Sequence, residues 1–243
     1  MRNARGTCYV LLMARVMRRQ GTYLVGRAGG YLLATLSSLL AAGILALVIH
    51  PVAGVLPLPW ALASSYRYAR YTKGWSGERE VVQALSGLDD SYYIVHDARI
   101  PKANIDHIVL GPNGVFVVET KNFSGRVICD HDTWRIARPG AHGQGHEIRS
   151  PSIQAKRNAI RVRQRISEFE QTLLRGFPRI EWVHAVVVLA NPQAEIVLDS
   201  PAVPVVGARE LVDHITGTRS PVTLPPTLLT KIGLALIGME TKA

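Results

Sequence analysis

Residues 105–121 consist of two short apolar runs joined by a turn, and each run carries charges where a packed strand should have none. The segment reads Ile-Asp-His-Ile-Val-Leu, then Gly-Pro-Asn-Gly, then Val-Phe-Val-Val-Glu-Thr-Lys. Two apolar runs separated by a turn of this composition predict an antiparallel β-hairpin. A chain that contains it must build a sheet, and that sheet must accommodate the charges.

The predicted register of this hairpin brings three charged groups to one place. Side chains alternate between the two faces of a strand, so Glu119 and Lys121 point the same way. If Pro112 and Asn113 form the tip of the turn, Asp106 lies opposite Glu119, with Cβ atoms about 4.5–5.5 Å apart. Two carboxylates this close repel each other unless a cation lies between them. The hairpin therefore predicts a divalent-metal site with a lysine beside it.

The net charge of +10 is concentrated near the N-terminus. No Asp or Glu precedes Glu78, and the first 77 residues contain nine Arg or Lys. The remaining residues contain 19 basic and 18 acidic side chains, so their net charge is only +1. The high pI thus describes the N-terminal segment, and any case for nucleic-acid binding must rest on local patches.

A stretch of 39 residues between Arg27 and Arg67 has no Asp, Glu, Lys or Arg. Within it, residues 31–49 are apolar or small, and as a helix they would reach about 28 Å, close to the hydrocarbon thickness of a bilayer. Basic residues flank both ends of the stretch, and positive flanks face the cytoplasm. A hairpin with both ends inside satisfies that rule best, and a single span is the alternative.

A signal peptide and a buried core helix account for the apolar stretch less well than a membrane segment does. A signal peptide is disfavoured because 27 residues precede the apolar run, far more than an ordinary signal core has. A buried core helix is disfavoured because helices of soluble proteins rarely stay uncharged over this length. We expect attachment to the inner or plasma membrane, with the globular part facing the cytoplasm.

The rest of the chain alternates predicted strands and helices, which is typical of an α/β fold with a central mixed β-sheet flanked by helices. We expect a helix from an N-cap at Ser76 to about residue 88, and a long helix from Pro151 to about residue 175. Residues 135–150 are rich in Gly and His and predict a loop. Further strands are expected at 92–96, 125–130, 182–189 and 203–206, and further helices at 208–216 and 224–237.

Glu78 and a stripe of arginines are further candidates for function. In the helix that follows Ser76, Glu78 falls on the apolar face, where a carboxylate is costly unless it is paired or bound to a metal. The structural alternative is a carboxylate stabilised by the helix dipole. In the helix from Pro151, three arginines recur every four residues, which suits either a solvated face or sequence-independent phosphate contacts. They are Arg157, Arg161 and Arg165.

Several segments, in this order, resemble the NERD ("nuclease-related") domain, which is assigned to the PD-(D/E)XK nuclease-like superfamily. A Glu-x-Lys motif alone is weak, but its combination with a Gly-x-x-Gly-Glu helix and an Ile-Asp-His strand is specific. The resemblance covers roughly residues 74–192. It rests on residues 74–81 (Gly-Trp-Ser-Gly-Glu-Arg-Glu-Val), 105–107 (Ile-Asp-His), 111–114 (Gly-Pro-Asn-Gly), 119–122 (Glu-Thr-Lys-Asn), 124–125 (Ser-Gly), Trp134 and 150–154 (Ser-Pro-Ser-Ile-Gln).

The resemblance implies a restriction-endonuclease-like fold and a division of labour among five residues. It implies Asp106 and Glu119 as Mg²⁺ ligands, and Lys121 as the group that orients or activates water. It also implies Glu78 and Gln154 as supporting groups. The role of Gln154 rests on the resemblance alone.

The expected organisation of the chain follows from these assignments. We expect a basic N-terminal segment (1–30), a transmembrane helix or hairpin (31–66) and a juxtamembrane linker (67–73). The nuclease-like domain is expected at 74–192, with a C-terminal strand and helix extension at 193–243.

The favoured function is a membrane-anchored nuclease that uses Mg²⁺, or Mn²⁺ in its place, to hydrolyse DNA, with RNA as a further candidate substrate. Asp106, Glu119 and the Thr120 carbonyl oxygen would suit the metal, which prefers oxygen ligands. The main alternative is a catalytically silent, membrane-tethered module that binds nucleic acid or protein. A plain salt bridge of Lys121 with one carboxylate is the third interpretation, and it leaves the second carboxylate and Glu78 unexplained.

Overall fold

The computed structural model describes residues 15–18, 23–137 and 145–237. The chain divides into two compact units, one formed by residues 21–77 and the other by residues 1–20 and 78–243. The expected basic N-terminal segment lies largely outside the described residues.

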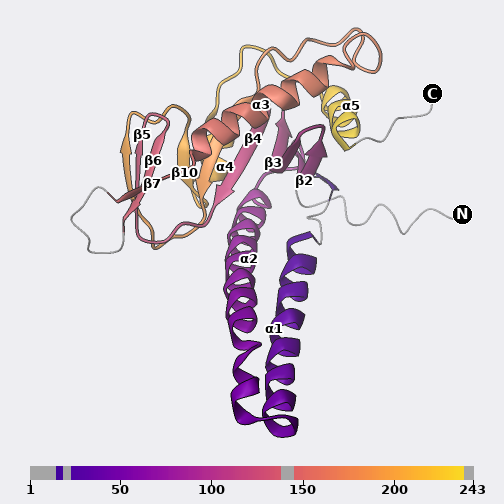
Figure 1. Ribbon diagram of the computed structural model, residues 1–243. Coiled ribbons are helices and arrows are strands. Elements are labelled where there is room, and N and C mark those ends of the chain that lie inside the picture. Colours follow the sequence, from indigo (N-terminus) through magenta and orange to yellow (C-terminus); the bar gives the residue numbers. More distant parts are fainter. Residues whose placement is uncertain (1–14, 19–22, 138–144, 238–243) are drawn as a thin grey trace, which may run out of the picture. The chain divides into compact units, whose positions relative to one another are not determined.

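The larger unit is built on a six-stranded mixed sheet with the strand order β1-β2-β3-β4-β8-β10 (Figure 1). Strands β2, β3 and β4 pair in antiparallel fashion, whereas β8 is parallel to both β4 and β10. The strands are β1 (Arg15–Arg18), β2 (Tyr93–Ile100), β3 (Ala103–Gly111), β4 (Gly114–Lys121), β8 (His184–Leu189) and β10 (Val205–Gly207). The expected mixed sheet is therefore confirmed.

A second, four-stranded sheet lies beside the first, with the strand order β7-β6-β5-β9. Its strands are β5 (Arg126–Asp130), β6 (Thr133–Ala137), β7 (His146–Ile148) and β9 (Glu195–Asp199). Trp134 is fully buried beneath this sheet, and its indole N–H donates to Ser152 Oγ at 2.9 Å. This bond ties the second sheet to the start of helix α3 (Pro151–Ser167).

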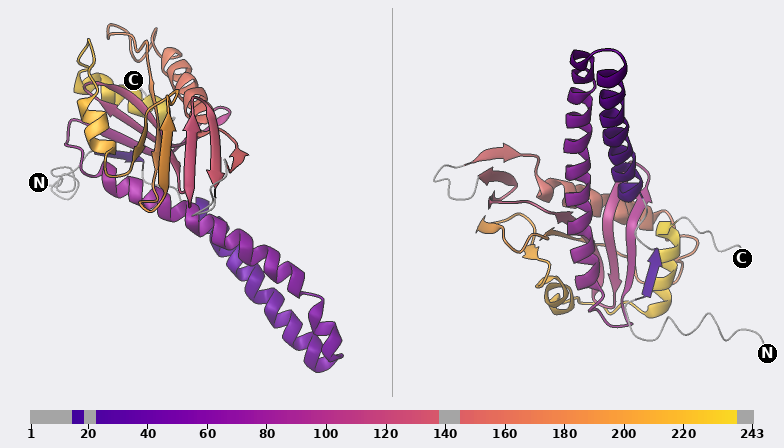
Figure 2. Two further views of the ribbon diagram at one scale, coloured as in Figure 1. Left: turned by 90° about the vertical axis from the view of Figure 1, so that its left-hand side faces the viewer. Right: turned by 90° about the horizontal axis from the view of Figure 1, so that it is seen from below.

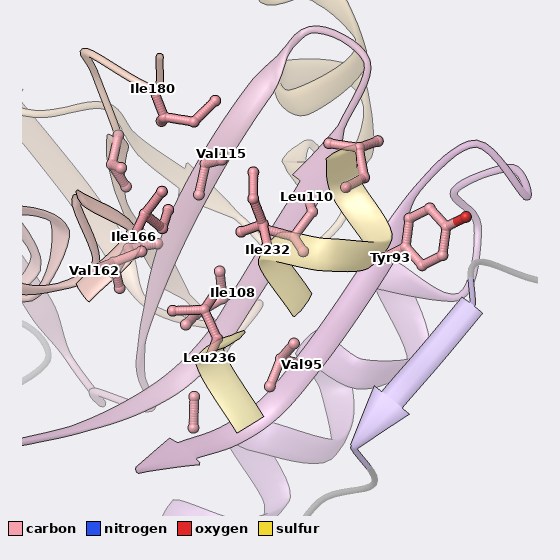
Figure 3. Packing of buried hydrophobic residues seen from close by; sticks show 14 of the residues in the cluster. Tyr93, Val95, Ile108, Leu110, Val115, Val162, Ile166, Ile180, Ile232 and Leu236 are labelled. Carbon is pink, nitrogen blue, oxygen red and sulfur yellow. The ribbon is translucent and has the colours of Figure 1, made fainter. Parts of the chain in front are cut away.

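Helices cover both faces of the six-stranded sheet, because strands β2–β4 and β8 are apolar on both sides. Helices α3 and α5 (Pro226–Ile237) pack on one face, where Val162, Ile166, Ile232 and Leu236 meet strand residues such as Ile108 (Figure 3). On the other face, the last turns of α2 (Leu58–Leu85) and helix α4 (Leu211–Gly217) pack against Val109, Phe116 and Val118.

The smaller unit is a helical hairpin (Figure 2). Helix α1 (Tyr23–Val48) is followed by the short 3₁₀ helix η1 (Pro51–Val55) and by the residues of α2 up to Gly77. The two long helices run side by side: Thr35 Oγ1 donates to Ser64 Oγ at 3.0 Å, and the rings of Tyr31 and Tyr71 stack with centroids 5.4 Å apart. Residues 26–48 form one helix long and apolar enough to cross a membrane.

Glycine is required where η1 folds back on α1. A Cβ atom at Gly54 would lie 2.8 Å from the carbonyl oxygen of Ala42 and 2.8 Å from the Cβ atom of Ala46, two residues of α1. Such contacts are far inside van der Waals distance, so a larger residue would push η1 away from α1. The end of the hairpin is therefore held by close backbone packing.

Several expected element boundaries were wrong. Ser76 is not an N-cap, because α2 runs without a break from Leu58 and Ser76 Oγ donates to the Lys73 carbonyl at 2.9 Å. Gly74 and Gly77 weaken a helix by about 1 kcal/mol each, which did not suffice to end it. Residues 135–150 are not one loop, since β6 and β7 occupy both ends and 138–144 lie outside the described residues.

Helix α3 ends at Ser167 rather than near residue 175. Beyond it the backbone forms successive tight turns, in which Phe169 N–H donates to Ile166 O and Thr172 N–H donates to Phe169 O. Leu174 is buried in the core and Phe169 packs against it. Strand β9 was not expected at all, because most of its side chains are exposed and its pattern is not apolar.

The pairing of α1 with α2 predicts an efficient disulfide in the variant Thr35→Cys/Ser64→Cys, made in a Cys8→Ser background. The two hydroxyl oxygens are 3.0 Å apart, so sulfur atoms in their place fall within bonding range after small adjustments. Mild oxidation of the full chain, followed by thiol counting by mass spectrometry, measures the bond. The native Cys129 is buried and its pKa is raised to about 11, so its thiol does not compete.

The matched control is Leu36→Cys/Leu62→Cys, since both leucines lie on the same two helices and are exposed. This pair should stay reduced. Equal oxidation of the two pairs would contradict the observed pairing of the helices.

Candidate active site

The turn of the β3–β4 hairpin fixes the register of the two strands. Pairing runs from Gly111 opposite Gly114 to His107 opposite Val118, which leaves Pro112 and Asn113 at the tip. This is the register expected from the sequence, and its continuation sets Asp106 opposite Glu119.

Three contacts anchor the tip of this turn. The Asn113 side-chain amide donates to the Ile215 and Thr218 carbonyl oxygens at 2.6 and 3.0 Å, and Leu224 N–H donates to Pro112 O at 2.8 Å. Gly114 has φ +141°, a conformation that side chains disfavour, so glycine is needed at this position. Segments more than 100 residues away thus hold the turn in place.

The charged residues of the hairpin meet a polar stretch of α3. Lys121 Nζ donates to Glu119 Oε1 at 2.5 Å and to Gln154 Oε1 at 3.3 Å. The other oxygen of Glu119, Oε2, accepts from the Asn158 amide at 3.4 Å. Asp106 Oδ2 accepts from the backbone N–H of Thr120 at 2.8 Å. We call Asp106, Glu119, Lys121, Gln154 and Asn158 the hairpin cluster.

Burial makes the negative charges of this cluster costly. The Glu119 side chain is only 1% exposed, and burial, followed by repulsion from Asp106, raises its pKa to about 7 against the opposing effects of Lys121 and Asn158. Burial also raises the pKa of Asp106, although the Thr120 N–H and the Lys121 ammonium oppose the shift and Asp97 adds to it. Both carboxyl groups therefore bind protons more tightly than usual, and a bound cation would favour their charged forms.

Two residues near the cluster were not anticipated. Asn158 follows Gln154 by four residues, so both lie on one side of α3, and this spacing was a signal available in the sequence. Asp97 adopts φ +48° and interrupts the pairing of β2 with β3 between His96 and Ala98. Its Oδ2 is buried without a hydrogen bond and lies 3.6 Å from Arg99 NH2. A carboxylate in an apolar strand was the available signal for Asp97.

The other expected site residues lie apart from these contacts. Glu78 is half-buried on α2, whose neighbouring residues Val81 and Leu85 pack on the sheet face opposite to α3. Its catalytic role stays a prediction. Arg157 on α3 is exposed, and Arg161 is half-buried.

Arg165 on α3 already has partners. It bonds Glu168 at 2.5 Å and stacks over the Phe169 ring, with the guanidinium carbon 4.7 Å from the centroid. A phosphate contact would have to compete with this ion pair, so Arg165 is less available to a polyanion than Arg157.

The donor set of the cluster suits a hard cation. Asp106 and Glu119 offer carboxylate oxygens, and Thr120, between Glu119 and Lys121, adds a backbone carbonyl. Mg²⁺ is commonly held by one or two carboxylates together with waters and phosphate oxygens. Among the residues that the structure describes, no three His, Cys, Asp or Glu side chains gather as a metal-binding group. Substrate and water would therefore complete the coordination.

Comparison with known proteins agrees with this geometry. Residues 73–190 match the family described as the nuclease-related domain, NERD. This stretch is a nuclease-related domain. The hairpin cluster lies entirely within the NERD region, whereas helix α1 lies outside it.

The chain is also similar to an uncharacterized protein from Bacillus anthracis. The two are 48% identical over 59 residues, which is 22% of this chain and 28% of the Bacillus protein. The chain thus spans little more than a quarter of that relative. No solved structure matches the chain.

The buried charge of Glu119 predicts that Glu119→Gln stabilises the metal-free protein at pH 8 but not at pH 5. A carboxyl whose pKa rises from 4.5 to about 7 on folding contributes stability below pH 4.5, and this contribution is lost as the pH rises through 7. The amide avoids that loss, so Tm at pH 8 should rise by about 5 °C. Thermal unfolding in chelator checks it.

The matched control is Glu181→Gln, because Glu181 is exposed. This variant should unfold at the parent temperature at both pH values. A Glu119→Gln protein that is less stable than the parent at pH 8 would contradict the electrostatic account of the cluster.

Proposed function

We propose that this protein is a membrane-anchored, Mg²⁺-dependent nuclease that hydrolyses DNA phosphodiester bonds at the cytoplasmic face. The single observation that carries the proposal is the hairpin cluster, in which two carboxylates and a lysine meet inside a nuclease-related domain. A purely structural sheet has little use for three charges on one strand face. Structural salt bridges pair one acid with one base, and here Asp106 is left over.

In this proposal, Asp106 and Glu119 hold the metal together with the Thr120 carbonyl oxygen. When bound, Mg²⁺ polarises a phosphoryl oxygen and acidifies a coordinated water. The Thr120 N–H fixes one oxygen of Asp106, and the Asn158 amide fixes one oxygen of Glu119. Asp106 thus keeps a second oxygen whose direction is set by this bond, whereas Glu119 would offer Oε1, which Lys121 Nζ also contacts at 2.5 Å. Such hydrogen bonds orient the ligands of a metal site.

Lys121 would act on the water and on the phosphate. Its ammonium is positioned by Glu119 and Gln154, and its side chain is 23% exposed, so substrate can reach it. A cation there orients a water molecule and stabilises the negative charge that develops on the phosphoryl oxygens. Gln154 is a positioning residue for Lys121.

The contacts with the substrate would not depend on the nucleotide sequence, because they are made to its phosphates. Arg157 and Arg161 lie on the helix that carries Gln154 and Asn158, so they suit phosphates on either side of the scissile bond. Arg165 contributes less because Glu168 already pairs with it. Cleavage assays with DNA and with RNA show which of the two the protein hydrolyses.

The helical hairpin would hold the protein to the membrane. Helix α1 is long and apolar enough to cross a bilayer, and α2 returns alongside it. A hairpin in the bilayer leaves both of its basic ends on one side, which the positive-inside rule assigns to the cytoplasm. The nuclease-related domain begins at residue 73, within α2, and would act in that compartment.

The decisive test is cleavage of supercoiled DNA, linear DNA and RNA by the full chain in detergent with Mg²⁺ or Mn²⁺. Asp106→Ala and Lys121→Ala should each lower the rate by about 100-fold or more, because each removes a group that stabilises the transition state. Asp90→Ala removes an exposed carboxylate and is the matched control. It should cleave at the parent rate.

Failure of the folded, metal-loaded parent to cleave any substrate would overturn the nuclease. Tight nucleic-acid binding without turnover would then favour the membrane-tethered binding module. That alternative has one observation in its favour, the net charge of only +1 over residues 78–243.

The raised pKa of Glu119 also predicts the pH dependence of metal binding. Mg²⁺ requires the carboxylate, so a proton must leave when the metal binds below pH 7. The affinity for Mg²⁺ should therefore rise about 10-fold from pH 6 to pH 7 and level off above pH 7.5. Isothermal titration calorimetry in two buffers of different ionisation enthalpy measures both the affinity and the proton released. A pH-independent affinity would contradict the assignment of Glu119 as a ligand.

A further inference from the structure

The helical hairpin contains a cavity between its two helices. The cavity has a volume of about 430 Å³ and is lined by Tyr31 from α1 and by Arg67, Arg70, Tyr71 and Gly74 from α2. All five residues belong to the unit formed by residues 21–77. The two arginines and two tyrosines lie at the end of the hairpin that also carries Arg27 and Lys73, beyond the stretch without charged residues.

An aromatic ring lies beside each of the two arginines, both of which are exposed. The guanidinium carbon of Arg67 lies 5.7 Å from the centroid of the Tyr31 ring, which itself stacks on Tyr71. The guanidinium carbon of Arg70 lies 5.9 Å from the centroid of the Tyr66 ring. A guanidinium that contacts a ring through its face keeps its N–H edge available to an acceptor. The cavity therefore presents guanidinium donors to an acceptor from solvent or lipid.

No carboxylate neutralises these arginines within the hairpin. Residues 21–77 contain no Asp or Glu, and neither Arg67 nor Arg70 forms an ion pair among the described residues. Two adjacent guanidinium groups repel each other unless an anion lies between them. Arginine forks match the oxygens of a phosphate group, which they bind in bidentate fashion.

The position of the cavity along the hairpin indicates where that phosphate comes from. From Tyr31 to Val48, the end of α1, the helix rises about 26 Å, and no charged residue occurs between them. This length is close to the hydrocarbon thickness of a bilayer. If the end of the hairpin reaches one surface of the hydrocarbon, Tyr31 and Arg67 lie at the other, where lipid phosphates are found. Tyrosine is also enriched at that level.

We propose that the cavity binds the phosphate of an anionic phospholipid headgroup. Arg67 and Arg70 bind the phosphate oxygens, the stacked rings of Tyr31 and Tyr71 form an apolar wall, and Gly74 leaves room for the headgroup. A Cβ atom at Gly74 would meet nothing within 4 Å, which shows open space on that side. The inference rests on the membrane placement proposed above and is independent of nuclease activity.

The test uses native mass spectrometry of the full chain in neutral detergent, with dioctanoyl phosphatidylglycerol and dioctanoyl phosphatidylcholine as probes. The parent should bind the anionic lipid at least 10-fold more tightly than the zwitterionic one. Arg67→Gln/Arg70→Gln should lose about 30-fold in affinity for phosphatidylglycerol, because it removes the two guanidinium groups that hydrogen-bond the phosphate directly. Gly74→Leu should weaken binding with no change in charge, because the new side chain fills the cavity.

The matched control is Arg27→Gln/Lys73→Gln, which removes two charges from the same end of the hairpin without changing the residues that line the cavity. It should bind phosphatidylglycerol nearly as well as the parent. An equal loss in both double variants would overturn the site and indicate general attraction to positive charge. No preference of the parent for phosphatidylglycerol would overturn it as well.

Two further arms identify the source of the phosphate. Inorganic phosphate at millimolar concentration should not displace the lipid, and its displacement of the lipid would assign the cavity to free phosphate. Displacement of the lipid from the parent by a short DNA duplex would assign the cavity to nucleic acid. Flotation of the full chain with vesicles separates the two proposals: loss of flotation refutes membrane placement, whereas flotation without lipid preference refutes the cavity alone.

Discussion

The register of the β3–β4 hairpin is the constraint on which the candidate site depends. A shift of one residue in this pairing would turn Glu119 and Lys121 to the opposite face of the sheet, away from α3. The turn that prevents the shift is fixed from outside, through Asn113 and Pro112, by segments that follow residue 214. The described C-terminal part of the chain thus supports the hairpin cluster, although none of the residues of the cluster belongs to it.

The same hairpin shows how stability and chemistry oppose each other. Strands β3 and β4 are buried on both faces, which stabilises the sheet, yet this burial is also the first cause of the raised pKa values of Asp106 and Glu119. Lys121 and Asn158 offset part of the cost through direct bonds. A site of this kind is less stable when empty than an apolar core of the same size. Binding of a cation would recover that stability.

Features set by local sequence were predicted, and features set by tertiary contacts were not. The hairpin register follows from the Gly-Pro-Asn-Gly turn and the alternation of faces, and the mixed sheet follows from the order of apolar runs. The start of α2 at Leu58 was missed, because Ser76 and its neighbouring glycines imitate a helix start. Asn158 has its position only through the packing of α3, and Asp97 through an irregular β2–β3 pairing. The spacing of Asn158 from Gln154 and the carboxylate of Asp97 in an apolar strand were signals in the sequence, but neither signal shows which groups these side chains contact.

The connection between α1 and α2 has a consequence for how such a hairpin would be made. The connecting residues 49–57 carry no formal charge, and the side chain of His50 accepts the Val52 N–H and so caps η1 internally. Moving a charged loop across a bilayer is costly, and a loop of this kind avoids the cost. The hairpin could therefore enter the lipid as a folded pair of helices from the side on which the chain is synthesised, with no hydrophilic segment to translocate.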